Sequence, residues 1–301
     1  MTDLPDLIES DATNLAGQDT GREHLSHSSL SMLLSCPQKY GFAYEDRLEP
    51  IARRDALALG KAFQLAVEAG DPQVGFDAVY DDFRVMSPED EAKRQTQAVT
   101  VRAASTLYLS KFPDNEGQKE FEYLVRLRNP WTGSYSRTYD LLGFADEVRE
   151  GTDSFTLIEN KFVGQIGTLQ IRRLPLDRQL ALSAYGIWRA TGRPVSKVSY
   201  RFTRKPSIKQ RKNESIGDFC ERIEYDYLAR PEFYLVEETL YRDHADLARI
   251  ECELWAWAEQ VRSGNRARIW PRNTSHCLDF GGCQFLPLCL GDADAEHLYQ
   301  E

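Results

Sequence analysis

The order of hydrophobic and polar residues along this chain changes period several times, and each period predicts a different element. Over residues 55–69 and 242–263 the large apolar residues recur at helical spacing, which predicts amphipathic helices. Elsewhere, short runs rich in Val, Tyr, Phe and Thr stand between turn residues, as they do in strands. Strands are expected near 119–128, 137–149, 154–161, 195–204 and 233–240, and further helices near 88–111, 176–191 and 216–229. The pattern therefore indicates a mixed α/β fold.

The two ends of the chain differ from this patterned body. Residues 1–24 hold six acids, one base and few large apolar residues, so we expect a disordered acidic tail. Residues 291–301 form a second acidic tail. After the first tail we expect a short helix with Ser26 or Ser28 as its N-cap. Residues 25–290 are then a single domain with a helical N-terminal region and a cysteine-bearing C-terminal segment.

Net charge and hydropathy limit the partners of the chain. The formal net charge of -10 speaks, taken alone, against a nucleic-acid partner. The two tails contain ten of the acids and one base, however, and residues 25–290 carry 36 bases and 37 acids. No run reaches the roughly 20 apolar residues of a membrane span, and the first residues lack the order of a secretory signal. We therefore expect a cytoplasmic protein, with no membrane partner, for which DNA is not excluded.

One predicted hairpin carries the residues best suited to catalysis. In its second strand, Glu159 and Lys161 share a face because strand side chains alternate. The hairpin can bring Asp146 beside Glu159. Two such carboxylates repel each other unless a cation lies between them, and their oxygens suit Mg²⁺ or Mn²⁺. Lys161 could orient a water molecule or stabilise charge on an attacked phosphate. The alternative interpretation is a solvated strand edge with an acid near the turn.

A strongly basic segment follows the strand expected at 195–204. It holds six bases and no acid, and its functional interpretation is a set of phosphate contacts along DNA. A solvated basic loop is the alternative. The six bases are Arg201, Arg204, Lys205, Lys209, Arg211 and Lys212.

Three of the six cysteines are evenly spaced near the C-terminus. Cys277, Cys283 and Cys289 each stand six residues apart in a stretch rich in Gly and Pro. In a reducing compartment, clustered cysteines are more often metal ligands than disulfides. A cluster or a zinc ion needs a fourth ligand beyond these three thiolates. Cys220 and Cys252 lie in helical patterns and are expected to be small hydrophobic residues.

Several short motifs occur in the order typical of one enzyme family. The two acids and the lysine of the hairpin resemble the core of the PD-(D/E)XK nuclease superfamily, and in particular its RecB-type branch. That branch includes the exonucleases of CRISPR adaptation and phage-encoded relatives. Residues 25–40, with their Ser-x-Ser start and Cys-Pro, resemble its opening helix, and residues 59–64 resemble its Gly-x-x-x-His helix. Gln179 with Tyr185 resembles its Gln-x-x-x-Tyr helix, and the cysteine triplet resembles its iron–sulfur ligands.

This resemblance implies a fold, a metal site and a cluster. The fold is a restriction-endonuclease-like core, with a central mixed sheet flanked by helices. Asp146 and Glu159, with the backbone carbonyl of Asn160, would bind Mg²⁺ or Mn²⁺, and Lys161 would position the attacking water. Cys36 would join the cysteine triplet around a 4Fe-4S cluster, with zinc as the alternative. Gln179, Tyr185 and the basic segment would contact DNA.

Two positions depart from the family pattern. Gln64 stands where the family has a metal-binding histidine, and an amide oxygen is a weak ligand. Glu68, one turn further on, could offer a carboxylate or could be a solvated helix acid. The tyrosine of the Gln-x-x-x-Tyr motif is displaced, because Ser183 occupies the fourth place after Gln179 and Tyr185 the sixth.

The function expected from these motifs is a metal-dependent DNA exonuclease acting on single strands or DNA ends. A DNA-binding module with weakened catalysis on the same fold is the alternative, because of Gln64 and the displaced tyrosine. A zinc-stabilised interaction scaffold is a more distant possibility. A homo-oligomer or a recombination or repair partner fits such a nuclease.

Overall fold

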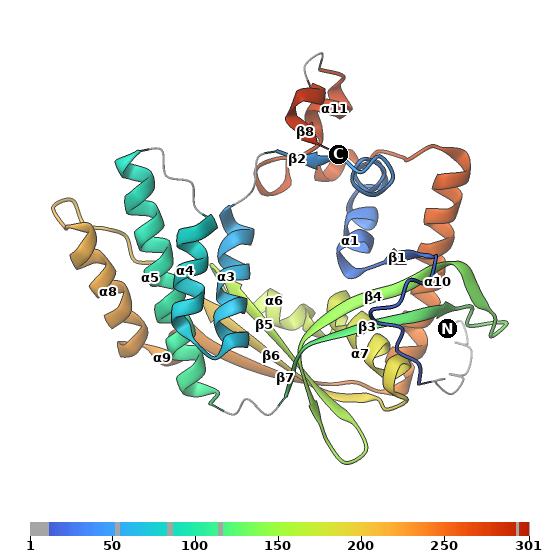
Figure 1. Ribbon diagram of the computed structural model, residues 1–301, viewed down its shortest axis with the longest axis horizontal. Helices are drawn as coiled ribbons and strands as arrows, with labels where there is room; N and C mark the ends of the chain where they lie inside the picture. Colours follow the sequence, from blue (N-terminus) through green and yellow to red (C-terminus); the bar gives the residue numbers. More distant parts are fainter. Residues whose placement is uncertain (1–11, 52–54, 83–86, 114–116, 293–294, 301) are drawn as a thin grey trace.

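The computed structural model describes residues 12–51, 55–82, 87–113, 117–292 and 295–300 (Figure 1). Its strands are β1 (Glu23–Leu25), β2 (Glu49–Pro50), β3 (Gln118–Arg128), β4 (Tyr135–Glu150), β5 (Phe155–Val163), β6 (Val195–Arg204), β7 (Leu235–Tyr241) and β8 (Tyr299–Gln300). Its α-helices are α1 (His27–Ser35), α2 (Pro37–Tyr40), α3 (Asp55–Ala69), α4 (Pro72–Asp82), α5 (Pro88–Lys111), α6 (Thr168–Arg173), α7 (Arg178–Thr191), α8 (Ile216–Ala229), α9 (Pro231–Tyr234), α10 (His244–Ala267) and α11 (Leu286–Leu290).

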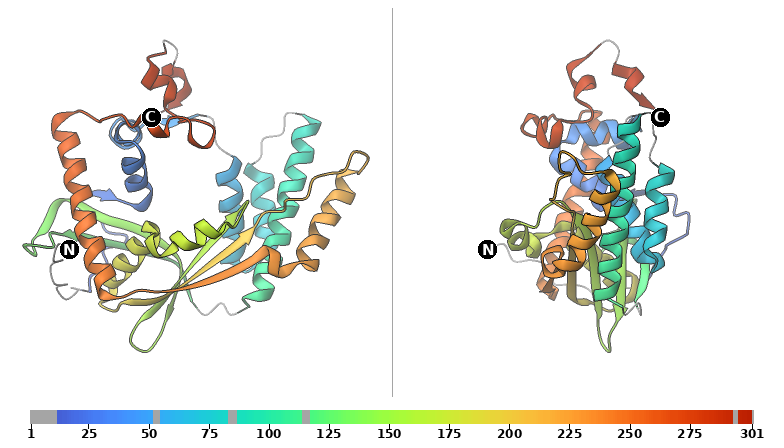
Figure 2. Two further views of the ribbon diagram at one scale, coloured as in Figure 1. Left: turned by 180° about the vertical axis from the view of Figure 1, so that it is seen from behind. Right: turned by 90° about the vertical axis from the view of Figure 1, so that its left-hand side faces the viewer.

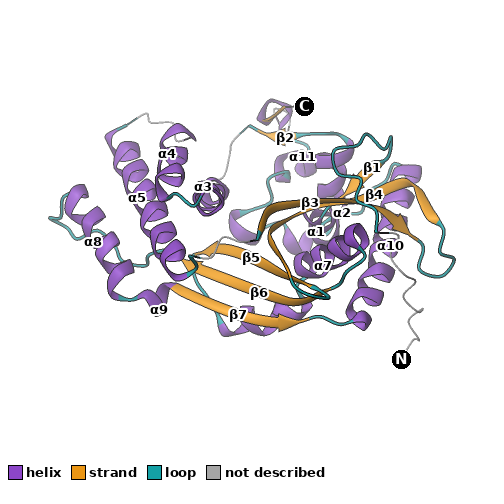
Figure 3. Ribbon diagram, turned by 60° about the horizontal axis from the view of Figure 1, so that its bottom comes forward, coloured by secondary structure: helices purple, strands orange, loops and turns teal. Residues whose placement is uncertain are grey.

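A mixed sheet of six strands forms the centre of the fold. Its order is β1-β4-β5-β6-β7, and β3 pairs with β4 along the remaining edge. The pairs β1–β4 and β5–β6 are parallel, and the other pairs in this sheet are antiparallel. Figure 3 shows the strands with helices on both sides. The predicted mixed α/β class, with a central mixed sheet flanked by helices, is confirmed.

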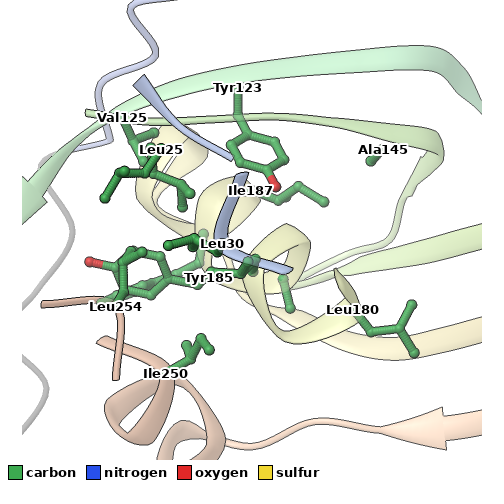
Figure 4. Packing of buried hydrophobic residues seen from close by; sticks show 14 of the residues in the cluster. Leu25, Leu30, Tyr123, Val125, Ala145, Leu180, Tyr185, Ile187, Ile250 and Leu254 are labelled. Carbon is green, nitrogen blue, oxygen red and sulfur yellow. The ribbon is translucent and has the colours of Figure 1, made fainter. Parts of the chain in front are cut away.

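The two faces of the sheet are covered by different helices. On one face, α1, α7 and α10 pack over residues such as Tyr123 and Val125 (Figure 4). On the other, α3, α5 and α8 enclose a second cluster that contains Phe63, Tyr108 and Phe162. Because strand side chains alternate, neighbouring residues of β5 belong to different layers. Strand β5 therefore has one set of side chains facing α7 and another facing α3 and α5.

Helix α7 lies close to the sheet because of a glycine. A Cβ atom on Gly186 would come within 2.2 Å of the Tyr123 ring, which is fully buried in β3. The missing side chain allows the helix to pack directly on that ring. This packing fixes the height of α7, and so of Gln179 in its first turn, above the sheet.

The expected disorder of residues 1–24 is wrong for residues 12–24. Asn14 Nδ2 donates to the Glu122 carbonyl at 2.9 Å, and β1 pairs with β4. Arg22 Nε lies 2.8 Å from Asp140 Oδ1, whose side chain is fully buried. A buried carboxylate needs a cationic partner, and Arg22 supplies it from a segment whose composition resembles a tail. Residues 1–11 lie outside the described residues.

The described part of the second acidic tail also folds back on the body. Strand β8 pairs antiparallel with β2, and Tyr299 Oη donates to the Gln284 carbonyl at 2.6 Å. Figure 2 shows this end of the chain above α1 and α2. Residues 293–294 and 301 lie outside the described residues. Acidic composition alone did not distinguish residues that pair in this small sheet from residues of a disordered tail.

Candidate active site

Strand β4 changes its partner beside the predicted catalytic acids. It pairs with β1 as far as Leu141 and with β5 from Glu147 onward. The pair Glu147↔Ile158 puts Asp146 across from Glu159, where the two strands begin to separate. The backbone N–H of Asn160 donates to Asp146 Oδ2 at 2.7 Å and replaces the ladder bond there. The predicted approach of Asp146 to Glu159 is therefore present in the structure.

Glu159 is fully buried, and its two carboxylate oxygens have different surroundings. Lys161 Nζ and Gln179 Nε2 both donate to Oε1, the amide at 2.6 Å. Oε2 is buried and accepts no hydrogen bond from any described residue. Burial, followed by the charge of Asp146, raises the pKa of Glu159 to about 8 despite the opposing charge of Lys161. A buried, unpartnered carboxylate oxygen beside a second carboxylate fits a hard divalent cation.

Lys161 stays charged although it is partly buried. Burial works to lower the pKa of its ammonium, but the negative charges of Glu159, Asp146 and Asp177 outweigh this and raise the pKa. Nζ also donates to Gln179 Oε1 at 2.9 Å. Gln179 thus holds the acid and the lysine together, and its amide is engaged within the site.

Helix α3 brings two more side chains toward the acids. Gln64 Nε2 donates to Glu68 Oε1 at 2.6 Å. Burial raises the pKa of Glu68, the Gln64 hydrogen bond opposes this, and the charges of Glu120 and Asp146 raise the pKa further. Glu68 is half-buried and accepts a hydrogen bond from Gln64, and the negative charge of Asp146 acts on it. Gln64 lies beside Glu68, its hydrogen-bond partner on α3.

Sequence analysis did not single out Glu120 as a site residue. It lies in β3, and its carboxylate acts electrostatically on Glu68. Its φ of 47° is in the left-handed region, which a residue other than glycine occupies only at a cost. The alternating pattern of the strand gives no sign of this backbone conformation. The i, i+4 spacing that relates Gln64 to Glu68 was the one sequence signal for this side of the site.

Two of the predicted DNA contacts are buried in the core. Tyr185 is fully buried among Leu30, Ile250 and Leu254, and its hydroxyl donates to Glu251 Oε1 at 3.0 Å (Figure 4). Arg201 is 7% exposed. Its guanidinium donates to Tyr108 Oη of α5 and to Glu237 Oε1 of β7. Tyr185 on α7 and Arg201 on β6 both face a packed layer of the core. Their predicted contact with DNA is therefore wrong.

The rest of the basic segment becomes more exposed along the chain. The guanidinium of Arg204 lies 4.1 Å from the centre of the Phe233 ring, and Lys205 lies 5.1 Å from that of Phe162. Both side chains are half-buried. Lys209, Arg211 and Lys212 are exposed in the loop that leads to α8. These three cations are available to a phosphate backbone.

The four cysteines predicted as ligands line one cavity in the C-terminal region. This cavity has a volume of about 310 Å³, and Cys36, Cys277, Cys283 and Cys289 all contribute to its wall. The backbone N–H of Asn273 donates to Cys36 Sγ at 3.3 Å. Within the described ranges, no group of three or more His, Cys, Asp or Glu side chains is arranged to hold a metal ion. The thiols therefore share a cavity without closing on one point.

Comparison with known proteins identifies the family. The family model of the PD-(D/E)XK nuclease superfamily matches residues 24–290, which is most of the chain and includes the hairpin, α3 and α7. The chain belongs to the PD-(D/E)XK nuclease superfamily. Membership implies a nuclease that hydrolyses phosphodiesters of DNA with divalent metals such as Mg²⁺ or Mn²⁺. The predicted restriction-endonuclease-like core is thereby confirmed.

A solved structure agrees with this PD-(D/E)XK assignment. The chain is similar to a crystal structure described as that of a putative exonuclease from Eubacterium rectale, with a TM-score of 0.52. The two are 12% identical, and the alignment covers 89% of this chain and 90% of the other. At this identity the likeness supports the fold alone. No curated protein matches the chain.

Proposed function

We propose that this PD-(D/E)XK protein is a divalent-metal-dependent DNA exonuclease acting on single strands or DNA ends. The observation that carries the proposal is the buried Glu159 carboxylate, which has one oxygen fixed by Lys161 and Gln179 and the other unpartnered beside Asp146. Such an arrangement costs free energy in the absence of a cation. It is therefore expected of a metal site and not of a structural ion pair.

The chain's own residues divide the work of hydrolysis in this proposal. Asp146, Glu159 and the Asn160 carbonyl would hold the metal, with Gln64 as a weak additional oxygen ligand. A bound Mg²⁺ or Mn²⁺ supplies a nucleophilic water and neutralises charge on the phosphate. Lys161, which donates to both Glu159 and Gln179, would orient the attacking water and stabilise the negative charge that develops on phosphate oxygens.

The substrate surface is proposed to include the exposed part of the basic segment. Lys209, Arg211 and Lys212 would contact phosphates without base preference, and binding would weaken as salt rises. Arg204 and Lys205 contribute at its inner end. We also propose membership of the RecB-type branch, with a role in DNA recombination or repair in the cytoplasm, in a phage or its host. In the part of the chain that the structure describes, no helix is long and apolar enough to cross a membrane.

Cleavage of end-labelled DNA tests this proposal. Wild type should degrade 5′- and 3′-labelled single or double strands only with Mg²⁺ or Mn²⁺ present. Asp146→Ala should lose cleavage by about 100-fold or more, because one metal ligand is removed. Asp153→Ala, in the exposed turn of the same hairpin, is the matched control and should cleave as wild type does. Equal cleavage by wild type and Asp146→Ala would contradict the site.

A DNA-binding module with weakened catalysis is the second candidate, and Gln64 favours it. This amide donates its N–H to Glu68 and offers only its carbonyl oxygen to a metal. Salt-dependent DNA binding without metal-dependent cleavage would support this candidate. In that case Gln64→His should restore cleavage with Mn²⁺, because imidazole is the stronger ligand for that ion.

The cysteine cavity is proposed to hold a 4Fe-4S cluster, with zinc as the alternative. Its four thiols come from the N-terminal helices and from the C-terminal segment, and a shared cluster would tie these parts together. Protein purified without oxygen should be brown and should absorb at about 400 nm. Colourless protein that contains zinc and fails to retain DNA would instead support an interaction scaffold.

A further inference from the structure

A row of polar side chains crosses the sheet on the face opposite the carboxylate of Glu159. Asn160, Arg201 and Glu237 are neighbours in the ladders of β5, β6 and β7. Arg201 Nε lies 3.2 Å from Glu237 Oε1, which also accepts from Ser199 Oγ. The row therefore joins the strand of the active site to the outer strand β7.

Tyr108 of α5 connects two members of this row. Its hydroxyl donates to Asn160 Oδ1 at 2.7 Å and accepts from Arg201 Nη1 at 2.9 Å. Its ring packs edge-on against Phe63, at 5.8 Å between ring centres. The phenol is thus fixed both by packing and by its two hydrogen bonds.

The position of Asn160 gives this contact a consequence for the site. Asn160 lies between Glu159 and Lys161 in β5, and its backbone N–H donates to Asp146. Asn160 is 8% exposed, and its side chain lies in a layer that also contains Phe63 and Phe162. A buried amide in such a layer costs free energy unless it is hydrogen-bonded. Tyr108 supplies that bond and so fixes the orientation of the peptide group that holds Asp146.

We propose that Tyr108, supported by Arg201 and Glu237, is a positioning residue for the metal site. It acts from the back of the sheet through Asn160, whose N–H holds Asp146 opposite Glu159. This inference rests on the proposed function, because it takes Asp146 and Glu159 as the metal ligands. A support of this kind outside the ligand set alters metal affinity or turnover by about tenfold or more when it is removed.

Tyr108→Phe tests the inference, because it removes the hydroxyl and keeps the ring. The dissociation constant for Mn²⁺, measured by titration calorimetry on the full chain, should rise about tenfold. In the cleavage assay kcat should fall while the KM for DNA stays unchanged, because no DNA contact is lost. Tyr227→Phe is the matched control. Tyr227 is buried in the same layer, and its hydroxyl donates to the Arg204 carbonyl at 2.8 Å.

The results separate this inference from the proposed function. If Tyr108→Phe and Tyr227→Phe have the same Mn²⁺ affinity and kcat, Tyr108 has no positioning role. If Asp146→Ala binds Mn²⁺ and cleaves as wild type does, the proposed function itself fails. The double variant Tyr108→Phe/Asn160→Ala should match Asn160→Ala alone in Mn²⁺ affinity, since the two residues act in series. Additive losses in the double variant would overturn the inference.

Discussion

The chemistry of single residues at this site depends on burial more than on residue type. Glu159 is one of 47 acidic residues in the chain, and it differs from an exposed carboxylate because one of its oxygens is buried and unpartnered. Burial works to lower the pKa of Lys161, but the negative charges of Glu159, Asp146 and Asp177 raise it overall. The hairpin motif identifies both residues, but only their surroundings give them a raised pKa. The ionisation of Glu159 and Lys161 should therefore be most evident when the pH or the metal content of the sample is changed.

The stability of the metal-free protein should fall as pH rises, because of Glu159. Its pKa is raised from 4.5 to about 8 in the folded state, so the native chain holds a proton there that the unfolded chain has lost. The stabilising effect of that proton is present below pH 4.5 and is lost as pH approaches 8. Glu159→Gln mimics the protonated form and should be more stable than wild type near pH 8 in EDTA.

Denaturant unfolding between pH 5 and about 9 measures this difference. The gap between Glu159→Gln and wild type should be small at pH 5 and should grow toward pH 8. Mg²⁺ should then stabilise wild type and leave Glu159→Gln unchanged. Glu221→Gln, an exposed residue on α8, should follow wild type throughout. A pH-independent gap would contradict the proposed state of Glu159.

At the scale of elements, three packing relations assemble the site. The change of partner along β4 places Asp146 at the point where the strands separate. Helix α3 brings Gln64 and Glu68, and α7 brings Gln179 to Glu159 and Lys161. Most of these elements were predictable, since α5, β6 and α8 have the bounds expected from periodicity. Helices α4 and α6 and strand β1 were not expected.

The close packing of α7 makes Gly186 a sensitive position. Gly186→Ala would force a Cβ atom to within 2.2 Å of the buried Tyr123 ring and should lower the free energy of unfolding by about 2 kcal/mol. Because α7 must move outward, Gln179 should also lose its contact with Glu159, and cleavage should fall. Chemical denaturation and the cleavage assay measure the two effects.

Gly217→Ala provides the matched control for that substitution. Gly217 lies in the first turn of α8, where an added Cβ would meet only Ser215 Oγ, at 3.7 Å. Alanine is the better helix former, so this variant should be as stable as wild type or more stable by up to about 1 kcal/mol. Equal losses in both glycine variants would show that the approach of α7 to Tyr123 does not explain the effect, because an added Cβ meets no close neighbour at Gly217.

At the scale of the whole molecule, the two ends of the chain meet. Strand β8 pairs with β2, and the cysteine cavity combines Cys36 with residues from the C-terminal segment. The Gln38 N–H also donates to the Pro271 carbonyl at 3.1 Å. In the view of Figure 2 this joined region stands over the sheet, between α10 on one side and α3 on the other. A cluster there would link distant parts of the sequence.

Cys277→Ser tests the cysteine cavity at this scale. If the cavity binds a cluster, the variant should lose the absorbance at about 400 nm. It should also melt at a lower temperature, because the link between the chain ends is lost. Cys252→Ser, in α10, lies outside the cavity and should keep both properties. Iron and zinc analysis of the two variants identifies the metal. Equal metal content in the two variants would show that the metal does not bind in the cavity.

The sequence by itself determined the fold class, most elements and the hairpin acids, because these follow from local periodicity and motif spacing. It could not determine that residues 12–24 supply Arg22 to Asp140, or that Tyr185 and Arg201 face inward. It also did not indicate that Glu120 acts electrostatically on Glu68 or that Tyr108 hydrogen-bonds to Asn160. Burial and pairing between distant segments decide these properties, since a side chain's surroundings depend on which elements pack against it. Only the tertiary structure contains that information.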